Sequence, residues 1–161
     1  MTSRRSRMNT SADFRYSSSL DTMRLAYDEV YVYTMGRPGF ILQHVVDAYG
    51  AHTSTSDSQP IGLVFALLGL YLHVEKHFSR RQVQTVHTLL GRRQRAWPIV
   101  DLPNDRGAMT VAEVLAASAG PEREQAIDAW CECVWHAFHA SRTRIRDLLA
   151  GVPDRAVIPQ G

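Results

Sequence analysis

The sequence predicts an all-α fold: a single helical bundle of four main helices plus one short helix. Three observations predict this class. Apolar residues recur three and four positions apart in several segments, as on one face of a helix. Two Ser/Thr-x-x-Gln/Glu capping boxes mark helix starts. No segment alternates apolar and polar residues in the way typical of a strand.

Composition limits the class of protein further. The chain has 161 residues, 45% of them hydrophobic, which suits one domain with its own core. The longest apolar run, 61–72, has 12 residues, whereas a membrane span needs about 20. A net charge of +2 and two cysteines indicate neither a polyanion partner nor a disulfide framework. We therefore expect a cytoplasmic protein that binds no membrane and no nucleic acid.

The domain organisation follows from where apolar residues begin and end. Residues 1–19 hold six serines and four arginines with little to bury, which predicts a disordered tail. The bundle should occupy 20–151, and 152–161 should form a C-terminal tail. Asp21 can cap a first helix that runs through Tyr33, before the Gly36–Gly39 segment breaks it.

Two helices should follow on either side of a polar loop. Ile41, Val45, Ala48 and Tyr49 give 40–51 one apolar face. The segment 60–78 begins with Pro60 and is apolar on nearly every side until His73, which is typical of a buried central helix.

The second half of the chain carries the capping boxes. Ser79 and Gln82 open a fourth helix, and Thr110 and Glu113 open a short helix that ends near Ala117. A last, long helix is predicted over 121–150. Its apolar stripe comprises Ile127, Trp130, Val134, Phe138, Ile145 and Leu148.

Gln43, His44 and Asp47 share one stripe of the second predicted helix. As a site, Asp47 and His44 would exchange protons with a substrate, and Gln43 would donate a hydrogen bond. As an alternative, His44 and Asp47 form an exposed pair worth a few tenths of a kcal/mol.

We expect Gln43, His73, Tyr49 and Arg37 to bind substrate. Arg37 lies in a Gly-Arg-Pro-Gly segment before a helix start, where anions bind.

A stripe of small residues, Gly62, Ala66 and Gly69, leads along the third helix to His73. Two helical glycines cost roughly 2 kcal/mol of propensity. Either close helix packing or a ligand cavity edged by His73 would offset that cost.

Histidines spaced i,i+4 on one helix can hold a metal, and His73 and His77 have this spacing. A third ligand would come from His44, His87, His136 or His139. No Glu-x-x-His motif is present for a di-iron bundle. We expect no cofactor and keep a metal on His73 and His77 as the alternative.

Three stretches resemble a bacterial family of uncharacterised proteins, domain of unknown function family 5946. They are Gln43–Tyr49, Gly69–Glu75 and Trp130–Trp135, and the Trp97-Pro98 and Leu102-Pro103 loop is also similar. The resemblance covers about residues 25–149. Many members carry an N-terminal zinc ribbon, whereas this chain has no cysteine before Cys131. The resemblance implies the fold and no activity.

Two functions remain open at this point. The first is a small bacterial enzyme acting on a polar or anionic small molecule by acid–base chemistry, with Asp47 and His44 as catalytic residues. The second is a non-catalytic helical subunit that binds and stabilises a partner protein, as a homo- or hetero-oligomer. An exposed aromatic surplus on the last helix would favour the subunit.

Overall fold

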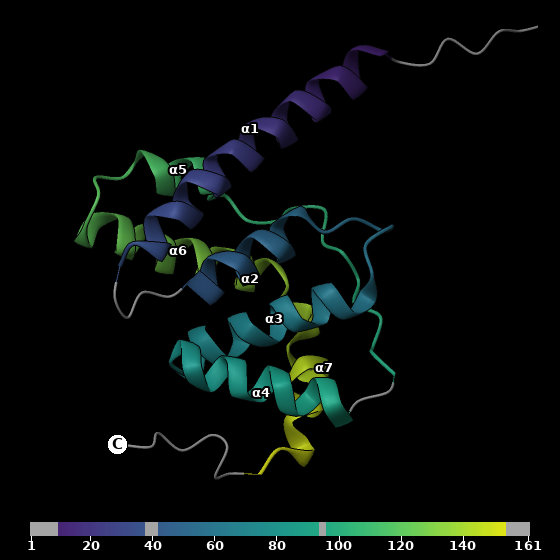
Figure 1. Cartoon of the computed structure of the whole chain (residues 1–161). Helices are drawn as coiled ribbons and strands as arrows, with labels where there is room; N and C mark the ends of the chain where they lie inside the picture. Colours follow the sequence, from purple (N-terminus) through teal and green to yellow (C-terminus); the bar gives the residue numbers. More distant parts are fainter. Residues whose placement is uncertain (1–9, 38–41, 94–95, 154–161) are drawn as a thin grey trace, which may run out of the picture.

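The computed structural model describes residues 10–37, 42–93 and 96–153. These residues form an all-α fold without strands (Figure 1). The helices are α1 (Thr10–Met35), α2 (Leu42–Thr53), α3 (Pro60–Val74), α4 (Arg80–Arg93), α5 (Val111–Ala116), α6 (Pro121–Ala137) and α7 (Arg142–Asp147), with 3₁₀ turns at His139–Ser141 and Leu148–Gly151. The all-α prediction is confirmed. The predicted count of four main helices is wrong, because five of these helices have 12 or more residues.

The apolar helix α3 lies at the centre, as the sequence predicts. It packs against α2, α4, α6 and α7 (Figure 1). From Leu63 to Leu72 every residue except Phe65 is buried. A helix surrounded on all sides has no face left for polar residues. The other helices each bury one face against it or against one another.

Helix α1 begins ten residues before the predicted boundary at Leu20. Residues 10–35 contain neither glycine nor proline. No helix breaker therefore stops α1 from extending N-terminally beyond Leu20, into the segment that has few apolar residues. The expected tail over 1–19 therefore overlaps the first turns of α1. Residues 1–9 lie outside the described part of the chain. The C-terminal half of α1 packs on α2 and α5, and the N-terminal turns project past the other helices in Figure 1.

Both predicted capping boxes are present. The Ser79 backbone N–H donates to Gln82 Oε1 at 2.8 Å, and the Gln82 N–H donates to Ser79 Oγ at 3.4 Å. The Thr110 N–H donates to Glu113 Oε2 at 2.7 Å. Each box satisfies backbone donors that a helix start would otherwise leave unpaired.

The predicted final helix over 121–150 is broken in the structure. α6 ends at Ala137, and Phe138 leaves helical geometry with φ −96° and ψ 12°. A 3₁₀ turn then leads into α7. Residues 122–150 contain no glycine or proline, so tertiary packing, rather than local propensity, produces the break. Phe138 at the break and Ile145 in α7 are both buried.

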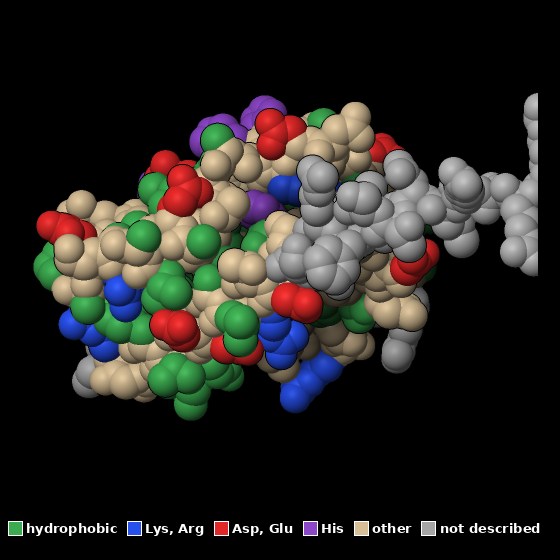
Figure 2. Space-filling model, turned by 90° about the horizontal axis from the view of Figure 1, so that it is seen from above, with side chains coloured by type: hydrophobic (Ala, Val, Ile, Leu, Met, Phe, Trp, Pro, Cys, Tyr) green, Lys and Arg blue, Asp and Glu red, His purple; other side chains and the backbone are tan. Residues whose placement is uncertain are grey.

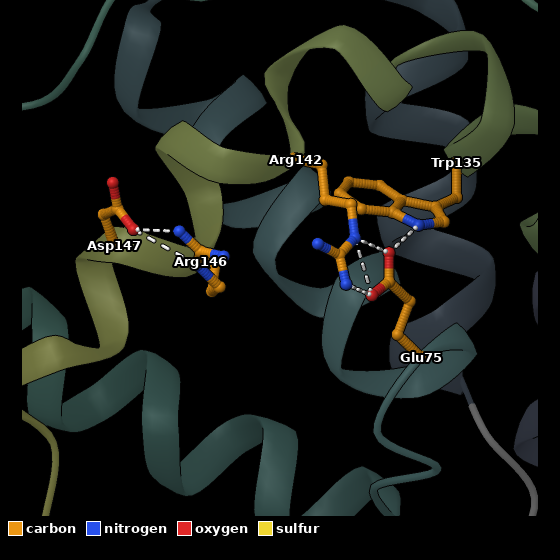
Figure 3. Close-up of polar contacts among 5 residues, drawn as sticks. All are labelled: Glu75, Trp135, Arg142, Arg146 and Asp147. Carbon is orange, nitrogen blue, oxygen red and sulfur yellow. Dashed lines mark hydrogen bonds and ion pairs between the residues drawn. The ribbon is translucent and has the colours of Figure 1, made fainter.

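Hydrogen bonds of the Glu75 carboxylate link the C-terminal end of α3 to α6 and α7 (Figure 3). Its Oε1 accepts a hydrogen bond from Trp135 Nε1 at 2.9 Å, and Arg142 donates Nε–H and Nη2–H to the same carboxylate at 2.8 Å and 2.6 Å. The Arg142 hydrogen bonds hold the pKa of Glu75 below its usual value. Arg146 and Asp147, also drawn in Figure 3, form a separate exposed pair.

Surface charges of both signs are interspersed with apolar side chains on the face seen in Figure 2. This distribution agrees with the small net charge of +2.

Glu75→Ala should lower the free energy of unfolding by about 2 kcal/mol at pH 7, because Trp135 Nε1 and Arg142 lose their acceptor. Urea unfolding measures this change. Glu132→Ala, an exposed site on α6, is the control and should change stability by less than about 0.5 kcal/mol. Since the pKa of Glu75 is depressed when folded, its contribution holds above the unfolded pKa and fades as pH falls through the folded pKa. Equal losses for both variants would contradict this role.

Candidate acid–base site

The sequence-predicted pair His44 and Asp47 is buried in the contact of α2 with α3 and α6. His44 is 1% exposed and Asp47 is 3% exposed. The alternative of an exposed surface pair is therefore wrong. The apolar residues Val45 and Ala48 are fully buried on the same helix, so α2 places polar and apolar side chains in the core together.

Asp47 occupies the space that a side chain on α3 would fill. A Cβ on Gly69 would lie 1.8 Å from Asp47 Oδ2. Gln43 Nε2 donates to Asp47 Oδ1 at 2.9 Å, while Oδ2 has no hydrogen-bond partner among the described residues. Burial raises the pKa of Asp47 well above its ordinary value, and the Gln43 hydrogen bond opposes this only in part. Asp47 thus favours its neutral, protonated form.

His44 stacks on His73 of α3, with ring centroids 3.5 Å apart and planes inclined by 23°. Burial, and then the charge of His73, lower the pKa of His44 to about 3. Neither of its ring nitrogens has a partner in the described part of the chain. At neutral pH His44 is therefore a neutral imidazole, in which one ring nitrogen carries a proton and the other a lone pair.

His73 connects this buried pair to the surface. Its side chain is 16% exposed, and Nε2 lies 3.1 Å from Oδ1 of the more exposed Asp128 on α6. Because an ionised carboxylate only accepts, Nε2 carries the proton in this contact. The His73–Asp128 pair brings residues 55 positions apart into one site.

Cys131 lies against the same cluster from α6. Its thiol is fully buried, with Sγ 3.6 Å from the backbone oxygen of His44. Burial raises the pKa of the thiol well above its usual value. This environment is that of a buried packing group rather than of a nucleophile.

Two predicted substrate-binding residues have other contacts. Tyr49 stacks on Tyr27 of α1 with centroids 3.9 Å apart. Arg37 pairs with Glu124 at the start of α6, one helical turn before Asp128, and lies 4.9 Å from the Tyr33 ring centroid. Pro38 and Gly39 of the predicted anion-binding segment lie outside the described residues.

The alternative metal pair does not form as predicted. α3 ends at Val74, and His77 lies beyond it in the left-handed region with φ 55°. His73 and His77 therefore do not share a helix face. His44 and His73 stack face to face, so their in-plane lone pairs do not converge on one point. Among the described residues, no three His, Cys, Asp or Glu side chains are placed to hold a metal.

The small-residue stripe serves close packing at two of its three positions. Gly69 admits Asp47, and Ala66 meets Gly50 of α2, where an added Cβ would lie 3.6 Å from the Ala66 Cβ. Gly62 is exposed, and a Cβ there would meet nothing within 4 Å. Three cavities lined by described residues include neither Asp47 nor His44.

Fold and site together define a small helical-bundle protein with an acid–histidine cluster at its core. The chain belongs to the family of unknown function DUF5946, whose model matches residues 24–139. This confirms the resemblance, and the match includes every residue of the cluster. No curated protein and no solved structure matches the chain. None of the helices in the described ranges is long and apolar enough to cross a membrane.

Gly69→Ala should destabilise the protein by about 1–3 kcal/mol, because its methyl group would overlap Asp47. Gly62→Ala on the same helix is the control. With open space around it, this change should raise stability by about 0.5–1 kcal/mol through helix propensity. Adding Asp47→Ala to Gly69→Ala should recover part of the loss in a urea-unfolding cycle. Additive losses would contradict the contact.

Asp47→Asn should become more stable relative to wild type as pH rises from about 4 to 8. The pKa of Asp47 is higher in the folded state than in the unfolded state. The stability of the wild type therefore falls as pH rises above the pKa of the unfolded carboxyl. The Asn side chain does not titrate, so the variant does not share this loss. Unfolding free energies over this pH range measure the slope. Exposed Asp57→Asn is the control. A stability difference that stays constant with pH would mean that Asp47 is ionised in the fold.

Proposed function

We propose that this chain is a bacterial cytoplasmic enzyme that acts on a polar or anionic small molecule by acid–base chemistry. One observation carries the proposal: Asp47 and His44 are buried together, and Asp47 Oδ2 and both ring nitrogens of His44 lack hydrogen-bond partners among the described residues. An unpaired buried polar group costs about 1–3 kcal/mol. Perturbed acid and base groups of this kind are typical of functional sites.

Each residue of the cluster has a role that its contacts support. Asp47 would act as general acid through Oδ2, because Gln43 already binds Oδ1. His44 would act as general base through a ring nitrogen, and its stacking on His73 fixes the plane of the ring. His73, hydrogen-bonded to Asp128, would pass the proton to the surface.

Access to the pair depends on His73. His44 and Asp47 are almost fully buried, whereas His73 lies over His44 and is partly exposed. A substrate would reach Asp47 and His44 past the partly exposed edge of His73.

The test compares wild type, Asp47→Asn and His44→Gln on a bacterial metabolite extract, followed by untargeted mass spectrometry. Wild type should convert at least one polar metabolite, and Asp47→Asn should slow that conversion by roughly 100-fold or more. His136→Gln, on the exposed side of α6, should leave it unchanged. Circular dichroism must first show that each variant is folded. A folded Asp47→Asn with full activity would contradict the proposal.

A second function, a subunit that binds a partner protein, is favoured by α1. Leu25, Val32 and Met35 are 67%, 66% and 65% exposed, and their spacing places them on one face of the helix. The aromatic residues of the last predicted helix, Trp130, Trp135 and Phe138, are buried instead. If wild type converts no metabolite in the survey, this second function gains support.

A further inference from the structure

A cavity of about 300 Å³ lies between residues 99–102, in the loop that joins α4 to α5, and the segment that leads into α3. The loop passes the N-terminal end of α3 in Figure 1. Pro60 and Leu63 of α3 contribute apolar surface to the cavity. Its volume is at the lower end of the range of ligand sites, about 300–1,000 Å³. The cavity is separate from the buried cluster around Asp47, because the two have no residue in common.

The loop side of this cavity is an extended segment with a proline at each end. Residues 98–103 contain neither helix nor turn. Burial alternates along them: Ile99 is 76% exposed and Val100 is 8% exposed, and the exposed Asp101 is followed by the half-buried Leu102. A period of two is that of a β-strand. The loop therefore presents a strand-like segment, although the described part of the chain contains no sheet for it to join.

The backbone of this segment has unpaired hydrogen-bonding groups along one edge. Arg144 of α7 donates a hydrogen bond to the backbone oxygen of Ile99. The backbone groups of an extended chain alternate between its two edges, so those of Val100 and Leu102 point away from Arg144. Among the described residues, the N–H and C=O groups of Val100 and Leu102 have no hydrogen-bond partner. An unpaired strand edge is a template for pairing with another chain.

Asp101 adds a negative charge beside this edge. Its carboxylate is exposed and lines the cavity. Within the described ranges it has no hydrogen bond or ion pair, since its neighbour Arg144 donates to Ile99 instead. Asp101 and Ile99 are two positions apart, so both lie on the outer face of the extended segment. A paired strand would therefore meet one acidic and one aliphatic side chain on this face.

We propose that residues 99–102 bind an extended segment of a partner protein by β-strand addition. A Lys or Arg of that segment lies opposite Asp101, and an aliphatic residue two positions away lies opposite Ile99. The aliphatic residue between them points into the cavity beside Leu63. Backbone hydrogen bonds to Val100 and Leu102 give affinity, and the side-chain contacts give specificity.

This proposal deepens the second function, the partner-binding subunit, by naming the chemistry of the partner. It does not rest on the acid–base function. Its test measures peptide binding alone, so the metabolite survey and this test can fail independently of each other.

An NMR titration of the isotope-labelled full chain tests the proposal with the end-blocked peptide Lys-Val-Ile-Val-Lys. Its pattern of side chains is the same in both strand directions. The peptide should bind with a Kd below about 1 mM and should slow the solvent exchange of the Val100 and Leu102 amide hydrogens. The same peptide with its three central amides N-methylated keeps the side chains but loses the backbone donors. It should bind at least about tenfold more weakly.

Three results of this titration would overturn the proposal. One is a Kd above about 10 mM for the unmodified peptide. Another is equal binding of the N-methylated peptide, which would mean that no backbone pairing takes place. The third is a set of shifted signals that leaves out residues 99–102.

Charge exchange tests the role of Asp101. Asp101→Asn should weaken binding of the Lys peptide by about two- to fivefold, whereas Asp21→Asn, which changes an exposed acid on α1, should leave the Kd unchanged. Asp101→Lys should bind Glu-Val-Ile-Val-Glu more tightly than the Lys peptide, because the sign of the charge at the edge is reversed. An unchanged Kd for Asp101→Asn, or an unchanged preference for the Lys peptide in Asp101→Lys, would overturn the assignment to this edge.

Other occupants of the edge are outcomes of the same titration. Residues 154–161 lie outside the described part of the chain, and they include Arg155 and Val157, a basic and an aliphatic residue two positions apart. Replacing both by serine should leave the affinity for the Lys peptide unchanged. A gain of about tenfold or more would mean that this segment competes for the edge, and would overturn the assignment to a partner protein. Self-association of the chain that the peptide reverses would assign the edge to a second copy and would overturn it likewise.

Discussion

The close contact between α2 and α3 at Gly69 is the constraint on which the rest of the site depends. Any side chain at position 69 would occupy the volume of the Asp47 carboxyl. Because Gly69 has no side chain, the Asp47 carboxyl fits into the core at this point. Asp47 also accepts a hydrogen bond from Gln43. The same approach of the two helices brings His44 onto His73. One missing methyl group therefore permits both the packing of the bundle and the cluster within it.

Burial shifts the pKa values of Asp47 and His44 in opposite directions, and each shift disfavours the charged form. Removing a carboxyl from water disfavours its anion, which raises the pKa of Asp47. Removing an imidazole from water disfavours its cation, which lowers the pKa of His44 to about 3. Asp47 Oδ2 and both ring nitrogens of His44 accordingly lie in the core without a hydrogen-bond partner among the described residues.

Local signals in the sequence predicted much of the fold, and long-range contacts account for what they missed. The boxes at Ser79 and Thr110 depend on residues three positions apart, so the sequence contains the whole of each motif. The break at Phe138 depends on packing against other helices, and no breaker residue marks it. The stripe of Gln43, His44 and Asp47 identified the polar face of α2. Its partners Gly69 and His73 lie 22 or more positions away on α3, and no periodicity could reveal that pairing.

The buried cluster of His44 and Asp47 and a cavity of about 410 Å³ between α1, α2 and the 102–106 loop are both contacted by adjacent residues of α6. Trp130 donates to His52 at the cavity wall, and Cys131 packs on the backbone of His44 in the cluster. Both histidines also belong to α2, two turns apart. Any shift of α6 along α2 would therefore change both contacts together, because consecutive residues cannot move independently within one helix. Trp130 and Cys131 are both fully buried, so this α2–α6 contact joins the core cluster to the wall of the cavity.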